Sequence, residues 1–487
     1  MSKLYVFGIG GTGARVLKSL TMLLAAGVKI DVDEIVPIVI DPDHAAADLT
    51  RTVKLMQDYN KIYNRIDHNN YNKNAFFGTK INLDIVPDVR MPLQNTENTD
   101  FQTYIGLPLM TNASGKHNAN YALAKMLFSE KNLNATMEVG FKGNPNIGSV
   151  VLNQFAMSDE FKNFAASVGQ DDRIFIISSI FGGTGASGFP LLLKNLRAIG
   201  DTQSGCENVK NAVIGAISVL PYFDVVPDNN PDETRRSEID SATFISKTKA
   251  ALSYYERNMT EANALYYIAD NISKQYANSE GGTTQQNDAH LIELASALAI
   301  VDFAGLTGLS TSNGKPENIV YKEFGIKTEA IEIAFNDLDS ETNSNIKKPL
   351  TTFTLFCKYL KEQLLDSYKS QPWAKDHKFD DNFLHLPFYK SELKDLREAY
   401  LQWLAEMANN VRAFKPFDLR EKKSDVFSLI TGEQPAKIMS LKSNYALFDD
   451  YLNTKQGKLK TDGSPEQIFV ELFYNAIDEL VKSKFRI

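Results

Sequence analysis

One pattern occurs twice in this chain and limits its fold more than any other: an apolar run leads into a glycine-rich loop, and the loop leads into leucines at helical spacing. The first copy passes from Lys3 through Gly8-Ile9-Gly10-Gly11-Thr12-Gly13 to Leu17 and beyond. The second follows the apolar run 173–179 and reads Gly182-Gly183-Thr184-Gly185-Ala186-Ser187-Gly188. A β-branched run at 35–40 completes a strand–helix–strand unit after the first loop. The sequence therefore predicts an α/β fold built on a parallel sheet.

The two loops have the composition of anion-binding loops. Glycines let an anion approach the backbone, and the N–H groups of the first helical turn hold it. Taken alone, the first loop also satisfies the G-x-G-x-x-G pattern of dinucleotide-binding proteins, with Asp41 placed to bind a ribose hydroxyl. The second loop is more specific, because four glycines in seven residues cost backbone entropy that an ordinary turn does not require. Two such loops indicate neighbouring strands that present both to one triphosphate.

The second loop resembles the G-G-G-T-G-[ST]-G signature of the tubulin/FtsZ superfamily, with Phe181 in place of its first glycine. Further segments resemble motifs of that family in the order that the family requires. They are 10–15 for its first phosphate loop, Asp41-Pro42-Asp43 for its phosphate and metal loop, 112–116 for its γ-phosphate loop, 220–223 for its Thr-x-Pro-Phe turn, Asp270-Asn271 for its guanine-reading pair, and Asn287-Asp288 for the start of its central helix. The resemblance covers about residues 1–305 and is strongest toward divergent bacterial tubulin-like proteins.

The resemblance implies a set of nucleotide-binding residues. They are Gly10, Gly11, Thr12, Gly13, Asp41, Asp43, Ala113, Ser114, Gly115, Gly182, Gly183, Thr184, Gly185, Ala186, Ser187, Gly188, Asp270, Asn271 and Asp288. The implied ligand is GTP or GDP, with Mg²⁺ held through the phosphates rather than by protein side chains alone. The sequence leaves ATP open as an alternative to GTP, because the base-reading positions match the family least well.

Hydrolysis is not assigned to any residue by this sequence. In the family, the loop after the central helix carries an acidic pattern that completes the neighbouring subunit's active site. Here the corresponding segment, 305–312, contains no carboxylate. Asp302, Glu317 and Glu323 are the nearest acids, and none lies in the family's pattern. Asp302 and Glu317 are the candidate catalytic acids. Because in-line phosphoryl transfer needs a positioned water and a charge clamp, we expect turnover to be slow or absent.

The chain divides into two expected parts. Residues 1–305 form a Rossmann-type nucleotide-binding domain that includes further strands at 212–220 and 264–268 and a long apolar helix at 288–303. Residues 306–487 form a smaller α+β domain with C-terminal helices. There the pattern predicts a strand at 328–335, a strand running into a helix at 350–368, and amphipathic helices at 391–409 and 464–484.

Bulk composition limits the classes of partner and the cellular compartment that we expect. A net charge of −8 and a pI near 5.5 argue against nucleic acid. The two cysteines lie far apart and provide neither a disulfide framework nor a zinc cluster, which is typical of a reducing compartment. The N-terminus enters a strand directly, without a leader pattern, and no early stretch is long and apolar enough to cross a bilayer. We therefore expect a cytoplasmic protein without a membrane span.

Three functions fit these observations to different degrees. The leading hypothesis is a GTP-binding protein, and slow GTPase, that self-associates head to tail in a nucleotide-dependent way. A non-hydrolysing, nucleotide-stabilised scaffold whose C-terminal helices bind a partner protein is the second. A nicotinamide- or flavin-dependent oxidoreductase is the third, and it leaves the second glycine loop unexplained.

Overall fold

The structure is a computed structural model, and it describes most of the chain. The described residues are 2–69, 71–141, 143–227, 241–270, 274–276, 282–284, 287–323, 330–420, 423–436, 444–457, 459 and 463–487. Its centre is a seven-stranded sheet with the strand order β11-β7-β5-β4-β1-β2-β3. Every pairing in this sheet is parallel. The predicted α/β fold with a parallel sheet is confirmed.

The strands of this sheet match the apolar runs closely. Their bounds are β1 (Lys3–Ile9), β2 (Glu34–Ile40), β3 (Lys80–Ile81), β4 (Arg173–Ser179), β5 (Val213–Val219), β7 (Ala264–Ile268) and β11 (Val320–Glu323). Without β11, the sheet has six strands. Counted in chain order within the sheet, they have the 3-2-1-4-5-6 order of doubly wound nucleotide-binding folds. The edge strand β11 lies beyond the domain boundary predicted at residue 305, yet it pairs with β7.

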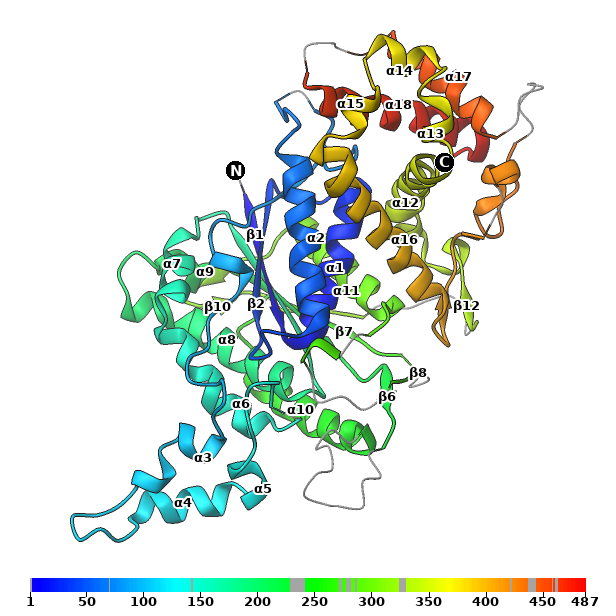
Figure 1. Cartoon of the computed structure of the whole chain (residues 1–487). Coiled ribbons are helices and arrows are strands. Elements are labelled where there is room, and N and C mark those ends of the chain that lie inside the picture. Colours follow the sequence, from blue (N-terminus) through cyan, green and yellow to red (C-terminus); the bar gives the residue numbers. More distant parts are fainter. Residues whose placement is uncertain are drawn as a thin grey trace.

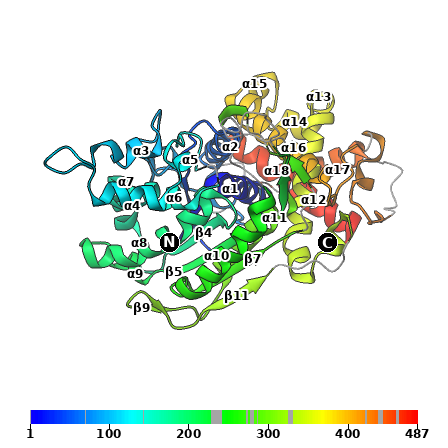
Figure 2. The same ribbon diagram turned by 90° about the horizontal axis from the view of Figure 1, so that it is seen from below.

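Both faces of the sheet are covered, as a parallel sheet requires. Side chains of β1 alternate between two cores: Leu4 and Val6 face α1 and α11, whereas Tyr5 and Phe7 face the layer that contains α8. Figures 1 and 2 show α1 (Gly10–Ala25), α2 (Ala47–Tyr63) and α11 (Leu291–Gly305) on one face. The other face carries α6 (Pro145–Val151), α7 (Asp159–Ser167), α8 (Gly183–Thr202), α9 (Glu207–Asn211) and α10 (Phe244–Asn258).

A projection formed by residues 99–137 extends away from the sheet (Figure 1, cyan). It contains the short helices α3 (Phe101–Tyr104), α4 (Ala119–Leu127) and α5 (Glu130–Leu133). Its two ends are joined where the amide of Phe101 donates to the carbonyl of Ala135. Asn118 caps α4, since its side chain accepts from the amides of Asn120 and Tyr121.

The part of the chain after β11 is chiefly helical among its described residues. Its helices are α12 (Ser340–Glu362), α13 (Leu364–Ser367), α14 (Pro372–Asp376), α15 (Asp381–Leu384), α16 (Lys394–Ala408), α17 (Tyr445–Gln456) and α18 (Pro465–Phe485). Three short strand pairs complete the fold: β6 (Phe223–Val225) with β8 (Lys274–Tyr276), β9 (Thr311–Ser312) with β10 (Lys315–Pro316), and β12 (Glu332–Ile333) with β13 (Ala413–Phe414).

Two predictions for this part need correction. The strand predicted at 328–335 is reduced to the two residues of β12, with residues 328 and 329 outside the described ones. The stretch 350–368 contains no strand: 350–362 is the second half of α12, whose run of buried residues from Leu350 to Leu360 contacts neighbours on several sides. Complete burial removes the amphipathic period, and a continuous apolar run then fits a strand or a helix equally well.

One hydrophobic core crosses the predicted domain boundary. Phe353 of α12 is fully buried, with its ring centroid 5.0 Å from that of Phe76 and 4.8 Å from that of Tyr400 in α16. Phe76 and Phe77 follow α2 in the chain and pack with the residues of α1 in the same core. The helical part is thus attached to the part that contains the sheet through apolar contacts. Across the described ranges, every helix is too short or too polar to cross a membrane.

Because this core is shared, we expect Phe353→Ala to lower the free energy of unfolding by about 3–5 kcal/mol, the usual result of removing a buried phenylalanine. Thermal unfolding followed by circular dichroism should remain a single transition at a lower temperature. Leu365→Ala is the control, since this side chain is 64% exposed and its removal should change stability by less than about 0.5 kcal/mol. Two separate transitions, with only one of them shifted, would contradict the shared core.

Candidate nucleotide-binding site

The order of the strands creates a crevice at one place. After β1 the chain moves toward β2 on one side, and after β4 it moves toward β5 on the other, so the direction reverses between these two paired strands. In open parallel sheets, ligands bind at such a point, outside the carboxyl ends of the strands. Gly10 follows β1 and Gly182 follows β4 after a short turn, so both glycine loops meet here. The sequence predicted neighbouring strands for the two loops, and the pairing of β1 with β4 confirms this.

A pocket opens at the carboxyl ends of these strands. It is lined by Gly10, Gly11, Thr12, Arg15, Asp41, Asp43, Ala46, Asp48, Val139, Gly140, Phe141, Gly143, Ser179, Phe181, Gly182, Gly183, Thr184, Gly185, Phe223, Val225, Phe244, Lys247, Tyr276 and Asn287. Three short segments therefore contribute backbone to the pocket: 10–12, 182–185, and the residues Gly140, Phe141 and Gly143, called 140–143 below, of which residue 142 lies outside the described residues. Two of these segments, 10–12 and 182–185, were predicted from the sequence.

The helices that leave these loops begin in a way that favours an anion. Neither α1 nor α8 has a side chain that caps its first turn, and neither has an acidic residue there. The first amides of a helix have no partner inside the helix and carry the positive end of its dipole. Some other helices of the chain are capped by a side chain, for example α7 by Ser158 and α12 by Asp339, whereas others, such as α2 and α10, are not. Two uncapped helices that start at one pocket suit a phosphate ligand.

Glycine is required in this pocket for two different reasons. A Cβ on Gly183 would lie 3.0 Å from the amide nitrogen of Gly143, so the loops at 140–143 and 182–185 are in backbone contact there. A Cβ on Gly11 would meet only Arg15, at 3.4 Å, and would otherwise occupy open space in the pocket. By contrast, a Cβ on Gly185 would lie 2.5 Å from the carbonyl oxygen of Ser179. Gly185 therefore allows α8 to pack against β4, in addition to its place in the lining.

The other predicted residues of the two loops lie outside the lining. Gly13 packs against Gly8, and a Cβ on it would lie 2.4 Å from the carbonyl carbon of that residue. Gly188 packs in the same way against Ile9. The hydroxyl of Ser187 donates to the carbonyl of Gly183 at 2.7 Å and is buried within α8, and Ala186 also lies in α8. These residues position the helices and are not carried into the candidate site.

The prediction that 112–116 forms the γ-phosphate loop at the pocket needs correction. Ala113, Ser114 and Gly115 are exposed on the projection and do not line the pocket. The side chain of Asn112 instead closes this turn on itself, accepting from the amides of Ser114 and Lys116 at 3.0 Å. Residues 139–141 and 143 line the pocket instead. Its sequence signal is the pair Gly140 and Gly143 directly before Asn144-Pro145, where α6 begins with proline in its first turn.

The predicted base-reading residues are separated from the pocket lining to different extents. The carboxylate of Asp270 forms an ion pair with Arg412 at 2.5 Å and does not line the pocket. Asn271 lies outside the described residues. Asp288 also lies outside the lining, but its neighbour Asn287 belongs to it, and the carbonyl of Asp288 accepts from the Tyr276 hydroxyl at 3.4 Å. The sequence predicted that the long apolar helix starts at Asp288. In the structure this helix, α11, starts at Leu291 and is capped by the side chain of His290.

An aromatic wall that sequence reasoning missed borders the pocket. It consists of Phe181, Phe223, Phe244 and Tyr276, all of which belong to the lining. The ring of Phe223 contacts those of Phe181 and Tyr276 at centroid distances of 5.5 Å each. Phe244 contacts Phe181 at 4.9 Å. Such a surface can bind a flat heterocycle by stacking.

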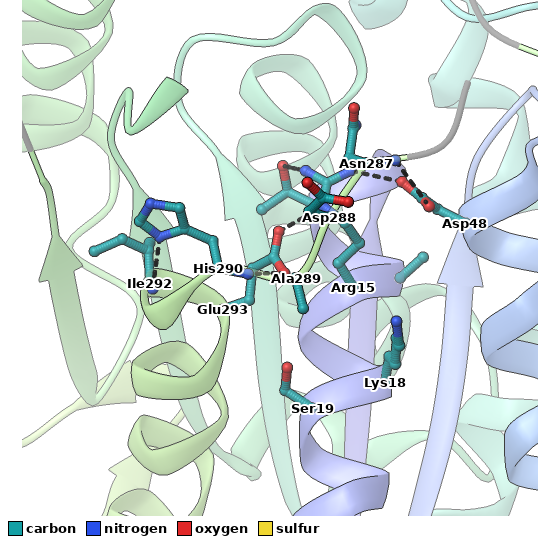
Figure 3. A network of polar contacts seen from close by, with 12 residues as sticks. Arg15, Lys18, Ser19, Asp48, Asn287, Asp288, Ala289, His290, Ile292 and Glu293 are labelled. Atoms are coloured by element: carbon teal, nitrogen blue, oxygen red, sulfur yellow. Dashed lines mark hydrogen bonds and ion pairs between the residues drawn. The ribbon is translucent and has the colours of Figure 1, made fainter. Parts of the chain in front are cut away.

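A buried charge network forms the floor of the pocket. Arg15 of α1 donates to Glu293 of α11 at 2.5 Å, to Asp48 of α2 at 3.1 Å and to the hydroxyl of Tyr222 at 2.9 Å. Figure 3 shows Arg15 beside Asp48 and the segment that begins at Asn287, whose amide donates to Asp48 at 3.4 Å. We call Arg15, Asp48, Tyr222 and Glu293 the Arg15 network. A buried guanidinium requires such partners, because its desolvation is otherwise too costly.

Two carboxylates line the pocket beside the first loop. Asp43 accepts from the amides of Ala45 at 3.2 Å and Gly282 at 2.6 Å. Asp41 is 8% exposed and accepts from the amide of Asp43 at 3.1 Å. Burial raises the pKa of Asp41 to about 7, with the negative charge of Asp43 adding to the effect. Near neutral pH, Asp41 is therefore only partly ionised.

The pocket lies at the carboxyl ends of the strands, and the two candidate catalytic acids lie at the opposite end, where the strands begin. Asp302, near the end of α11, accepts from Lys322 at 2.7 Å and from the hydroxyl of Tyr266 at 2.5 Å. Glu317 is exposed and accepts from the hydroxyl of Ser310 at 2.6 Å. The end of α11 is joined to the first residue of β4, because Arg173 donates to the carbonyl of Phe303 at 2.8 Å. Neither acid can reach the pocket of its own chain.

Comparison with known proteins adds a likeness of fold. No protein-family model matches the chain, and no curated protein matches it by sequence. Among solved structures, it is similar to CetZ from Methanosaeta thermophila at 15% identity and a TM-score of 0.30, over 62% of this chain and 54% of the other. It is also similar to CetZ2 from Haloferax volcanii, described as a GTPγS-bound protofilament, at 15% identity and a TM-score of 0.29, over 63% and 60%. An empty FtsZ dimer of M. jannaschii matches at 15% identity and a TM-score of 0.27, over 64% and 56%.

These are structures of the tubulin/FtsZ superfamily. The identities and TM-scores are low, as they would be for a divergent relative. The chain spans a little over half the length of the proteins it matches. Residue roles are not transferred at this identity, so the candidate site rests on the chain's own strand order, loops and pocket.

The raised pKa of Asp41 predicts a specific dependence of stability on pH. Because its pKa rises on folding from 3.8 to about 7, the folded protein holds a proton that the unfolded chain releases between these pH values. The free energy of unfolding should therefore fall as pH rises from about 4 to about 7. Asp41→Asn removes this group, so the variant should gain stability over the wild type across that range. Urea unfolding at a series of pH values measures the difference.

Asp159→Asn is the matched control, since the side chain of Asp159 is 89% exposed. Its stability should follow that of the wild type at every pH. If Asp41→Asn and the wild type showed parallel curves, Asp41 would not hold its proton in the folded protein.

Proposed function

We propose that this chain is a tubulin/FtsZ-like GTP-binding protein. The observation that carries the proposal is the meeting of two uncapped helix starts, those of α1 and α8, at one pocket where the sheet changes direction. A dinucleotide fold needs only one glycine loop at this point. Two loops from paired strands, with a third backbone segment at 140–143, provide more phosphate-binding backbone than an oxidoreductase requires.

The phosphates of the nucleotide would lie against the backbone of 10–12, 140–143 and 182–185. Thr12 and Thr184 add hydroxyl groups to this lining. Asp41 and Asp43 would otherwise repel a polyanion, and this favours a ligand that arrives with Mg²⁺. Asp41 and Asp43 would hold the ion, since Mg²⁺ prefers carboxylate and phosphate oxygens. It would neutralise negative charge on the phosphates.

The base would bind at the other end of the pocket. Phe223 and Tyr276 offer the aromatic surface there, and Asn287 offers an amide that can bind a base edge. Of the residues predicted to read guanine, Asp288 remains a neighbour of this end, whereas Asp270 is held by Arg412. We propose GTP as the nucleotide, following the resemblance of the loops.

The nucleotide would control association between copies. The segment 305–317 and the pocket lie at opposite ends of the strands, so a head-to-tail contact would place this segment of one copy over the pocket of the next. Such a contact is heterologous and repeats into an open filament unless the rotation closes a ring. Glu317 is the exposed acid on this segment and the better candidate for promoting hydrolysis, because Asp302 is neutralised by Lys322.

A second function is favoured by one observation: the described residues 305–312 contain no carboxylate. A scaffold that binds nucleotide for stability, without hydrolysing it, explains this absence as well as a slow GTPase does. The helices after β11 would then bind a partner protein.

The pocket is tested by Gly11→Val. The added Cβ would meet the guanidinium of Arg15, at 3.4 Å, and no backbone atom, so we expect the fold to persist and nucleotide binding to fall at least tenfold. Isothermal titration calorimetry with GTP, GDP and ATP in the presence of Mg²⁺ measures this. GTP should bind at least tenfold more tightly than ATP, because an unpaired polar group in the base site costs about 1–3 kcal/mol.

Gly457→Val controls for the general effect of valine, since a Cβ at Gly457 has no neighbour within 4 Å and lies far from the pocket lining. Gly185→Val is a poorer test, because its clash with β4 would disturb the fold itself. Unchanged affinity in a folded Gly11→Val protein would contradict the proposed site.

Association is expected to depend on the nucleotide and to be accompanied by slow hydrolysis. With GTP and Mg²⁺, light scattering should rise with protein concentration, while phosphate release stays slow. Glu317→Gln should slow this release further and leave assembly intact. A chain that stays monomeric at high concentration with GTP would favour the scaffold, and equal release by wild type and Glu317→Gln would exclude Glu317 as the acid.

A further inference from the structure

The helix α4 packs on the projection with one of its sides. Ala124 belongs to the core on the α8 side of the sheet, and Tyr121 and Phe128 pack against that core. These three residues recur at the spacing of one helix face. The ring centroid of Phe128 lies 4.8 Å from that of Phe101 in α3. The contacts fix the orientation of α4, so its opposite side points to solvent.

That opposite side is apolar. It is a stripe with the i, i+3, i+4, i+7, i+8 spacing of a helix face and consists of Ala119, Ala122, Leu123, Met126 and Leu127. All five residues are exposed. The exposed fraction is 53% for Leu123, 84% for Met126 and 62% for Leu127. A stripe with this spacing is normally the side on which a helix packs, so its exposure indicates a surface for another molecule.

Leu109 is a fourth large apolar side chain that the projection exposes, at 85%. It directly precedes Met110, whose carbonyl accepts from the amide of Asn118, the N-cap of α4, at 3.0 Å. Leu109 therefore lies close to the start of α4. No other helix or strand in the described ranges exposes three large apolar side chains, as α4 does. We call Leu109, Leu123, Met126 and Leu127 the projection patch.

The charge around this patch is positive. Residues 101–129 contain Lys116 and Lys125 but no Asp or Glu, although acidic residues make up about one in eight of a chain whose net charge is −8. Both lysines are exposed, and neither forms an ion pair with a residue that the structure describes. Lys125 lies on α4 at the border of the apolar stripe, beside Ala122. The patch therefore suits a partner that is apolar and negatively charged.

A second copy of the chain does not suit the patch. Pairing two copies through α4 would bring Lys116 and Lys125 toward the same lysines of the other copy, and residues 101–129 contain no carboxylate to compensate them. The two large apolar side chains that α10 exposes, Ile245 and Tyr254, lie on opposite sides of that helix. Within the described ranges, no other element of a second copy thus offers an apolar surface of matching size.

An anionic lipid surface suits both features of the projection. Its acyl region accepts apolar side chains without a specific counterpart, and its headgroups attract lysines. The shape suits it as well, because Figure 1 shows the projection reaching away from the sheet. The rest of the chain, which carries the excess of negative charge, then stays clear of a negatively charged surface.

We propose that the projection binds the surface of a membrane that contains anionic lipids. The projection patch enters the boundary between the headgroups and the acyl chains, and Lys116 and Lys125 contact lipid phosphates. The helix α4 has nine residues, so it lies along the surface and does not cross the bilayer. This inference goes beyond nucleotide binding and does not rest on the pocket.

Vesicle flotation tests the proposal without nucleotide. The vesicles contain phosphatidylcholine alone, or phosphatidylcholine with about one third phosphatidylglycerol. The wild type should float with the anionic vesicles at low salt and much less at about 0.5 M salt, which screens the contacts of the lysines. The triple variant Leu123→Gln, Met126→Gln, Leu127→Gln should bind at least tenfold more weakly, because glutamine is a good helix former but does not enter the acyl region.

The lysines are tested separately. The double variant Lys116→Gln, Lys125→Gln should bind anionic vesicles about tenfold more weakly or less tightly still, since each lysine near the surface contributes to the attraction. Its matched control is Lys194→Gln, Lys249→Gln, which removes two exposed lysines of α8 and α10. Leu365→Gln is the control for the apolar side chains, because Leu365 is 64% exposed on α13. Both controls should float as the wild type does.

Insertion can be followed by fluorescence. The chain has two tryptophans, Trp373 and Trp403, and both are fully buried. Met126→Trp therefore adds one exposed fluorophore in the projection patch. With anionic vesicles its emission should shift to shorter wavelength, and lipids brominated in their acyl chains should quench it. Leu365→Trp should show neither effect.

Three results would overturn the proposal. The first is a wild type that does not float with anionic vesicles, including the case in which sedimentation shows that the triple variant has lost self-association, which would make the patch a contact between copies. The second is flotation that the triple variant retains in full. If that variant does not fold, the third result decides: fluorescence of the Met126→Trp protein that anionic vesicles leave unchanged. Because no nucleotide is present, these results are independent of the proposed GTP binding.

Discussion

A positive charge buried at the first turns of α1 sets the conditions for the rest of this structure. Arg15 is 6% exposed and makes its contacts with α2, with α11 and with the turn after β5. Removing a guanidinium from water costs several kcal/mol unless carboxylates and hydrogen bonds surround it. The elements that supply those partners therefore have to meet beneath the pocket, and the Arg15 network joins them there.

The segment 287–289, which contacts the Arg15 network at Asp48, also contacts the helical part. Glu406 of α16 accepts from Lys18 of α1 at 3.1 Å and from the amide of Ala289 at 3.0 Å. Asn410 donates to the carbonyl of Ala289 at 2.5 Å. Asn287, two residues earlier, lines the pocket. The segment 287–289, which Figure 3 shows beside Arg15, thus contacts the pocket through Asn287 and α16 through Ala289.

Parallel pairing of β1 with β4 turns two local motifs into one site. Each glycine loop by itself is only a helix start that can bind an anion. Their distance in sequence is large, but the strand order makes them neighbours and directs both helix dipoles at the same pocket. Gly8 and Gly13 allow α1 to pack closely on β1, and Gly185 and Gly188 do the same for α8. Several glycines that sequence alone assigned to the ligand therefore serve the packing that positions the loops.

What the sequence determined by itself was local. Buried strands such as β4 and β7, the glycine loops after β1 and β4, and the amphipathic α18 follow from patterns within a few residues, so their existence and even their bounds were predictable. What only the tertiary structure decided depends on residues far apart. Asp270 is paired with Arg412 rather than placed at a base, and the loop 112–116 is closed by its own Asn112 and displaced on the projection, while 140–143 takes its place at the pocket. The physical reason is that an ion pair or a backbone contact between distant segments leaves no periodicity in the chain, and it exists only once the sheet has brought the partners together.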